Sequence, residues 1–206
     1  YDDDNGTDRG AVWILFMDDN GRVDREQKIS EDEGNFPKNL HNDDRFGSSV
    51  AGIGDLDRDG VLDLAVGAPL DDDGGSDRGA VWILFLNTDG TVRQTQKISN
   101  LAGGFDGDLD NGDYFGQAIA TIGDVDGDGS TDLAVGAPYD DDQGADRGAV
   151  WILFMNADGT VASNQKISAK LGNFDGNLDD DDHFGGALAG LGDLNNAGAD
   201  DLAVGA

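Results

Sequence analysis

The fold of this chain is decided by the stretch Asp55-Leu56-Asp57-Arg58-Asp59-Gly60-Val61-Leu62-Asp63. Its aspartates stand at positions 1, 3, 5 and 9, and a glycine stands at position 6. Oxygen ligands at alternate positions can converge on one cation, a carbonyl at position 7 can join them, and the glycine permits a sharp turn. Without a metal, the same residues would form a solvated turn in which the carboxylates repel one another. The stretch therefore predicts a calcium loop.

Two further copies of this stretch follow at intervals of 69 residues. The second is intact and reads Asp124-Val125-Asp126-Gly127-Asp128-Gly129-Ser130-Thr131-Asp132. The third is degraded, with Asn195 and Ala197 in place of two aspartates between Asp193 and Asp201. Because calcium affinity follows the charge of the ligands, we expect the third loop to bind weakly or not at all.

Other motifs repeat at the same interval. The motif Gly-Ala-Val-Trp-Ile-Leu-Phe begins at Gly10, Gly79 and Gly148. Phe-Gly recurs at Phe46, Phe115 and Phe184. Asp-Leu-Ala-Val-Gly-Ala begins at Asp63, Asp132 and Asp201. We therefore expect residues 1–206 to form one segment of three repeats, with units of about 1–69, 70–138 and 139–206.

Each unit contains four strand-like runs and no amphipathic helical period. In the second unit these runs are residues 80–85, 91–99, 116–123 and 133–137. The calcium loop lies between the last two runs, which excludes an EF-hand because that motif needs flanking helices. Small glycine-rich strands beside bulky ones are typical of propeller blades, whereas solenoid coils have only roughly 20–45 residues. The predicted fold class is all-β, with β-propeller blades of four antiparallel strands.

Three of these motifs together resemble an FG-GAP repeat, the calcium-binding blade of integrin α-subunit propellers: Phe46-Gly47, the loop 55–63 and Gly67-Ala68-Pro69. The resemblance implies an extracellular propeller that is stabilised by calcium and binds protein or carbohydrate partners. It places the first calcium on Asp55, Asp57, Asp59, Asp63 and the Val61 carbonyl. The second set is Asp124, Asp126, Asp128, Asp132 and the Ser130 carbonyl, and the third is Asp193, Asn195 and Asp201.

The boundaries of the chain fall within blades, so that the strand runs group as two, four, four and two. Propellers usually have about four to eight blades, and the first and last runs need partners. Three arrangements would supply these partners: a homo-oligomer of two chains that close a six-bladed ring, a head-to-tail filament of chains, or a longer covalent array of repeats. The sequence leaves all three open. The chain opens on Tyr1 rather than methionine, so we expect a piece of a longer protein.

The composition of the chain restricts its possible partners and its location. The 43 acidic residues outnumber the 13 basic ones, which gives a formal charge of −30 and argues against nucleic acid and anionic lipid as partners. There is no cysteine, and no apolar run reaches the roughly 18 residues of a membrane span. Weak calcium loops suit millimolar calcium outside the cell, so we expect a secreted or cell-surface protein.

Three other features need an interpretation. Asp-Arg-Gly follows a triple-Asp run three times, and we favour an arginine that neutralises the aspartates over a second cation site. The Asp-rich loops 105–113 and 174–182 could bind further calcium, but their first-unit counterpart lacks most of the acids, which favours a variable surface loop. The residues Trp13, Trp82 and Trp151 lie in apolar runs, so we expect core positions rather than sugar-stacking surfaces.

No catalytic motif is present, and His41 and His183 fall at different places in their repeats. The leading hypothesis is a non-enzymatic, extracellular, calcium-binding module for adhesion or structural self-assembly. Two alternatives stay open: a lectin-like module that binds glycans between blades, and an accessory domain of a larger secreted enzyme.

Overall fold

The computed structural model describes residues 2–206, so that Tyr1 lies outside the described part. This part contains twelve strands and no helix, hence no helix that could span a membrane. The strands are β1 (Val12–Met17), β2 (Val23–Ile29), β3 (Ser49–Gly54), β4 (Asp63–Ala68), β5 (Ala80–Leu86), β6 (Val92–Ile98), β7 (Ala118–Thr121), β8 (Leu133–Ala137), β9 (Ala149–Met155), β10 (Val161–Ile167), β11 (Ala187–Gly192) and β12 (Asp201–Gly205). The predicted all-β class is confirmed.

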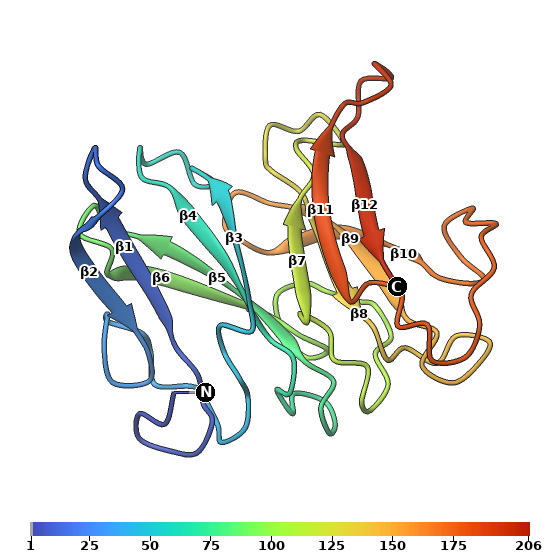
Figure 1. Ribbon diagram of the computed structural model, residues 1–206, viewed down its shortest axis with the longest axis horizontal. Coiled ribbons are helices and arrows are strands. Elements are labelled where there is room, and N and C mark those ends of the chain that lie inside the picture. Colours follow the sequence, from blue (N-terminus) through green and yellow to red (C-terminus); the bar gives the residue numbers. More distant parts are fainter. Residues whose placement is uncertain (1) are drawn as a thin grey trace.

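The strands form two sheets of four and two sheets of two. The four-stranded sheets have the orders β3-β4-β5-β6 and β7-β8-β9-β10, and every pairing in them is antiparallel. Figure 1 shows the pair β1–β2 at one end of the array and the pair β11–β12 at the other. We call β1–β2 the N-terminal half-blade and β11–β12 the C-terminal half-blade. The expected grouping of strands as two, four, four and two is therefore observed.

One inner strand is shorter than its sequence run. The run 116–123 predicts a continuous strand, but β7 covers only Ala118–Thr121. Gly116 has a φ of 91°, which turns the chain out of the strand, and Phe115 forms a parallel bridge with Gly79. The Phe-Gly motif is therefore a corner between sheets rather than the start of a strand.

The glycines of these motifs allow neighbouring sheets to touch through their backbones. A Cβ atom on Gly67 would lie 2.0 Å from the carbonyl oxygen of Gly116 in the next sheet, and Gly136 meets Gly185 at the same distance. No side chain fits at that distance, so that only glycine permits the approach. The Ser49 hydroxyl donates a hydrogen bond to the same Gly116 carbonyl at 2.7 Å.

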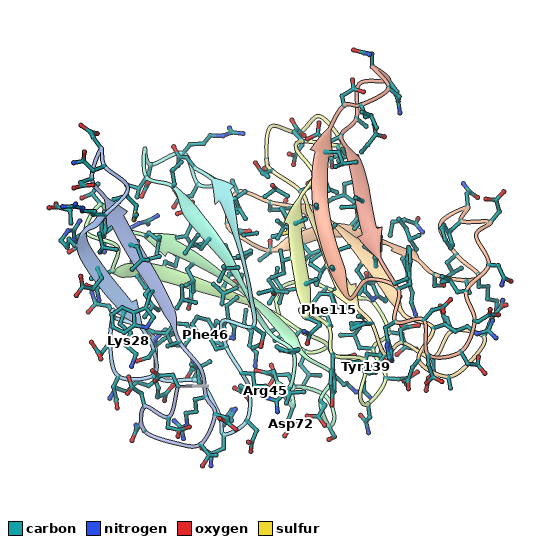
Figure 2. All side chains as sticks on the ribbon, viewed as in Figure 1. Lys28, Arg45, Phe46, Asp72, Phe115 and Tyr139 are labelled. Atoms are coloured by element: carbon teal, nitrogen blue, oxygen red, sulfur yellow. The ribbon has the colours of Figure 1, made fainter. Side chains whose placement is uncertain are left out.

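The apolar core lies between the sheets rather than inside any one of them. Phe46 and Phe115, which Figure 2 labels, are fully buried beside the glycine contacts. Trp82 and Trp151 are 3% and 5% exposed, and each packs edge-on against a phenylalanine of the preceding repeat, Phe36 or Phe105, at 5.1 Å between ring centroids. The expected core position is confirmed for these two tryptophans.

Trp13 is 54% exposed, so the expected core position is wrong for this residue. The phenylalanine that covers each of the other tryptophans comes from the repeat before it, and no repeat precedes Trp13 within residues 2–206.

The same phenylalanines correct an expectation about the loops that contain them. The loops before the Phe-Gly motifs are not wholly variable surface, because Phe105 and Leu109 (like Phe36 and Leu40) are buried in the core.

Candidate metal sites

The three acidic loops occupy equivalent places, each between the two inner strands of a sheet. Loop 1 (55–63) joins β3 to β4, loop 2 (124–132) joins β7 to β8, and loop 3 (193–201) joins β11 to β12. The glycine at position 6 has a φ of 92° in Gly60, 91° in Gly129 and 99° in Gly198, a conformation that glycine adopts without strain. This turn folds each loop back on itself.

Loop 1 brings together three of its predicted ligands. Carboxylate oxygens of Asp55, Asp57 and Asp63 all lie within 4.8 Å of one another. That spacing suits a cation held at about 2.3–2.6 Å from each oxygen, as calcium is in proteins. The loop holds the carboxylates in place with its own backbone, since the amides of Asp59 and Gly60 donate to Asp55 at 2.9 Å each.

Loop 2 repeats the arrangement with a different sequence between the aspartates. Oxygens of Asp124, Asp126 and Asp132 lie within 4.8 Å of one another. The Gly127 and Gly129 amides donate to Asp124 at 2.8 and 2.9 Å. In both loops, backbone hydrogen bonds hold the first aspartate in place, and these bonds do not depend on the intervening side chains.

The predicted ligands at positions 5 and 7 lie outside these two groups of three carboxylates. Asp59 and Asp128 instead accept hydrogen bonds from the backbone amides of Val61 and Ser130, at 2.8 and 2.7 Å. Coordination by these two aspartates and by the carbonyls of residues 61 and 130 stays a prediction.

The carboxylate at position 9 ties each loop to the third strand of its sheet. Asp63 accepts from the amide of Leu56 in its own loop and from that of Leu86 in β5, at 3.0 and 3.2 Å. Asp132 does the same with Val125 and Met155, at 2.8 and 2.9 Å. Burial raises the pKa of both carboxyls, and these hydrogen bonds oppose the rise. A bound cation would favour the charged form.

Loop 1 also has a basic neighbour that the sequence did not reveal. The Arg93 guanidinium, near the start of β6, forms ion pairs with Asp57 and, at 3.0 Å, with Asp59. Arg58 donates to the Gly129 carbonyl at 3.1 Å and so links loop 1 to loop 2. In the sequence, Arg93 stands out only because the equivalent residue of the next repeat is Ala162, which has no charge.

Loop 3 keeps the backbone of the other two loops. The Ala197 and Gly198 amides donate to Asp193 at 2.9 Å each, and the Leu194 amide donates to Asp201 at 2.8 Å. The Asn195 side-chain amide donates to Asp201 at 3.2 Å, where loops 1 and 2 have a carboxylate at this position. Its weaker calcium binding stays a prediction.

The triple-Asp runs are neutralised by a lysine, so the prediction that the neighbouring arginine does this is wrong. Lys97 in β6 contacts Asp71 and Asp73 at 2.7 Å each. Lys28, labelled in Figure 2, contacts Asp2 and Asp4 at 2.8 and 2.6 Å, and these hydrogen bonds raise its pKa to about 12. Arg78 instead donates to Asn111 at 3.0 Å, in the loop before Phe-Gly.

Comparison with known proteins identifies the repeats as FG-GAP repeats, the family that their motifs resemble. The FG-GAP repeat model matches residues 46–84 and 115–153. The chain is 32% identical to integrin alpha-3 of Cricetulus griseus over 199 residues, which is 95% of this chain and 16% of that protein. It is 37% identical to integrin alpha-PS2 of Drosophila melanogaster over 166 residues, 78% of this chain and 11% of that protein.

Integrin alpha-6 of Gallus gallus is 32% identical over 196 residues, again 95% of this chain and 16% of the relative. The chain thus spans less than a fifth of the length of each of these relatives. The repeats, the four-stranded antiparallel sheets and the relatives agree with one another. The chain therefore carries FG-GAP repeats and belongs to the FG-GAP family of β-propeller proteins.

Proposed function

We propose that this chain is an extracellular calcium-binding propeller module that serves adhesion or structural self-assembly and is not an enzyme. The observation that carries the proposal is the convergence of Asp55, Asp57 and Asp63 in loop 1, repeated by the equivalent carboxylates of loop 2. In both loops, despite their different intervening sequences, the amide of the position-6 glycine donates to the first aspartate at 2.9 Å.

Calcium in these loops acts as an architectural support. Each loop joins the two inner strands of a sheet, and its position-9 aspartate also bonds to the third strand. A cation that binds the loop therefore fastens three strands together and offsets part of the −30 formal charge of the chain. Loss of the metal would loosen the inner end of the blade before its outer strands.

An extracellular location is supported by the loop chemistry and by the relatives. Loops of this type, with several ligands from flexible side chains, suit the calcium concentrations outside the cell, at dissociation constants of about 10⁻⁴ to 10⁻³ M. The similarity to integrin alpha subunits favours cell-surface proteins as adhesion partners. Glycans are less favoured as partners, because Trp82 and Trp151 are buried and Trp13 alone of the three tryptophans leaves a face exposed to a sugar ring.

Self-association is the second part of the proposal. The strand pairs β1–β2 and β11–β12 carry the sequences of the outer and the inner half of a blade. Complementary strands, from further repeats or from a second chain, would complete both pairs to four-stranded blades.

A calcium titration by calorimetry, paired with thermal unfolding in calcium and in chelator, tests the metal part. We expect two sites and a higher melting temperature in calcium. The Asp126→Asn variant should lose the loop 2 site, whereas Asp158→Asn should keep both, because Asp158 is an exposed aspartate in the β9–β10 turn. No heat of binding together with an unchanged melting temperature in chelator would overturn the proposal.

A further inference from the structure

We infer that Asp146, Asp181 and His183 form a site for a divalent transition-metal ion such as zinc. Ligand atoms of these three side chains, which we call the His183 cluster, lie within 4.8 Å of one another. The inference goes beyond the proposed function, because it concerns a different metal and residues outside loops 1 and 2.

The His183 cluster lies where two loops of the chain meet. Asp146 belongs to the loop between β8 and β9, whereas Asp181 and His183 belong to the loop between β10 and β11. Both loops lie at the ends of the strands opposite to the acidic loops, beside Tyr139, which Figure 2 labels. The amide of Asp181 donates to the Ala145 carbonyl at 2.9 Å, and that of His183 donates to the Asp146 carbonyl at 3.1 Å. The backbone therefore holds the two loops together without help from the three side chains.

The donor set of the His183 cluster differs from that of the acidic loops. It combines one imidazole with two carboxylates, whereas the groups in loops 1 and 2 consist of carboxylates only. Imidazole nitrogen suits zinc, copper, iron and nickel, whereas calcium takes about six to eight oxygen ligands. Zinc binds nitrogen and oxygen ligands at about 2.0–2.2 Å, so a shift of roughly 1 Å would bring the three side chains onto one ion. The fourth position would hold water.

The surroundings of the cluster favour a metal ion. Tyr139 packs against the imidazole of His183, with 4.7 Å between the ring centroids. A ligand whose ring is held by packing loses less freedom when it binds a metal. Among the described residues, no lysine or arginine forms an ion pair with Asp146 or Asp181, and the adjacent Arg147 contacts Asp180 instead, at 2.9 Å. The two carboxylates are thus available to an added cation.

The same backbone recurs in the other two repeats with different side chains. In the first repeat, the amides of Asp43 and Arg45 donate to the carbonyls of residues 7 and 8. In the second, the amides of Gly112 and Tyr114 donate to those of residues 76 and 77. The sets equivalent to the His183 cluster are Asp8, Asp43 and Arg45 in the first repeat and Asp77, Gly112 and Tyr114 in the second.

Positive charge follows the number of carboxylates at this place. In the first repeat, two aspartates are accompanied by an arginine, which is always charged. In the second, a single aspartate is accompanied by a tyrosine. In the third, two aspartates are accompanied by His183, a residue type that binds metal ions but carries no permanent charge. A bound divalent ion would supply the positive charge that the arginine carries in the first repeat.

A metal ion in the cluster would fasten the loop after β8 to the loop before β11. Under the proposed function, calcium in loop 2 holds the other end of β8, so ions of different chemistry would hold the two ends of one strand. Because zinc would bind the folded chain, it should raise the melting temperature, and the rise should grow with the zinc concentration.

A zinc titration in excess calcium tests the inference, because calcium then competes for loops 1 and 2. Calorimetry of the native chain should give one zinc site per chain. His183→Asn should weaken this site at least tenfold, since loss of even an outer-shell partner typically costs metal sites about 10–100-fold. Asparagine tolerates the φ of 57° at this position, so the variant should fold. The matched control is His41→Asn, which changes the other histidine of the chain and should keep the native affinity.

Moving the histidine to another repeat tests whether the shared backbone defines the site. Arg45→His places an imidazole with Asp8 and Asp43 and should create a second zinc site. Tyr114→His is its control, because Gly112 leaves only one carboxylate at that place, and it should bind zinc at least tenfold more weakly than Arg45→His does.

Three results would each overturn the inference. The first is a native chain that binds no zinc. The second is equal zinc affinity of His183→Asn and His41→Asn, which would mean that zinc binds elsewhere. The third is an Arg45→His variant that binds no more zinc than Tyr114→His does.

Calcium binding separates this inference from the proposed function. His183→Asn should still bind calcium in loops 1 and 2, because both loops lie at the other end of the strands. A chain that binds zinc through His183 but no calcium would contradict the calcium proposal and leave the cluster standing. A chain that binds calcium but no zinc would do the reverse.

Discussion

Loops 1 and 2 bring together equivalent carboxylates but have different surroundings. In loop 1, Arg93 forms ion pairs with Asp57 and Asp59, so a basic side chain already offsets their charge. In loop 2, the equivalent residue is Ala162, and Asp126 and Asp128 have no lysine or arginine at that place. A calcium ion that enters loop 1 would either displace Arg93 from the two aspartates or share them with it. We therefore expect loop 2 to be the tighter site and loop 1 to depend less on calcium for its shape.

The largest expected effect comes from removing the position-9 aspartates. Asp132→Ala leaves the amides of Val125 and Met155 without an acceptor, which costs about 2–4 kcal/mol of unfolding free energy in chelator. Asp63→Ala should cost a similar amount there, because Asp63 accepts the equivalent two bonds. In calcium the loss at Asp132 should be the larger one. Urea unfolding in both conditions measures this, and a larger calcium-dependent loss at Asp63 would contradict the ranking.

The next effect concerns pH and should be the same in both repeats. Burial raises the pKa of Asp44 and of Asp113 to about 7, although each accepts a backbone hydrogen bond that opposes the shift. The folded pKa of each carboxyl exceeds the ordinary value of 3.8. In chelator, the contribution of each carboxyl to the unfolding free energy should therefore be complete near pH 4 and be lost as the pH rises through 7. Each group contributes at most about 4 kcal/mol, and less after screening by water.

The variants Asp44→Asn and Asp113→Asn remove this titration. Each should stabilise the chain at pH 8 and leave it unchanged at pH 4, with matching pH profiles of the unfolding free energy. A difference between the two profiles would show that the repeats differ beyond their acidic loops.

Exchanging the basic residue between the two repeats tests the cause of their difference directly. Arg93→Ala should tighten calcium binding by loop 1 by about threefold to tenfold, and Ala162→Arg should weaken loop 2 by a similar factor. Calorimetry of the two variants and of the double exchange gives both values. Unchanged affinities would mean that the ion pairs with Arg93 do not compete with the metal.

The smallest effect is expected at the link between the loops. Arg58→Ala removes one hydrogen bond to the Gly129 carbonyl at the surface. We expect less than about a twofold change in the calcium affinity of loop 2. A larger change would mean that the two loops bind calcium cooperatively.

Much of the fold could be predicted because its elements repeat in sequence. The 69-residue interval, the apolar runs and the Asp-Gly turns locate the strands within a few residues, and the boundaries of the chain locate the two half-blades. The alternation of aspartates in loop 1 likewise predicts that Asp55, Asp57 and Asp63 converge, whereas Asp59, which was expected to join them, lies outside that group.

Features that depend on a neighbouring repeat were harder to predict. Trp13 has the same local sequence as Trp82 but a different exposure, because burial needs a phenylalanine from another repeat. Arg93 lies in β6, which β5 separates from the strand that follows loop 1, and no pattern within residues 55–63 points to it. The buried Phe105 and Leu109 were hidden by the acidic residues around them, although their spacing recurs at Phe174 and Leu178.

The backbone contact between Gly67 and Gly116 has a consequence for how such chains can evolve. Because neighbouring sheets meet there through a glycine and a carbonyl oxygen, the fit between them does not rely on particular side chains. A duplicated or deleted unit of 69 residues would present the same contact to its new neighbours. Unequal recombination could therefore change the number of units in one step, while the exposed loops diverge freely afterwards.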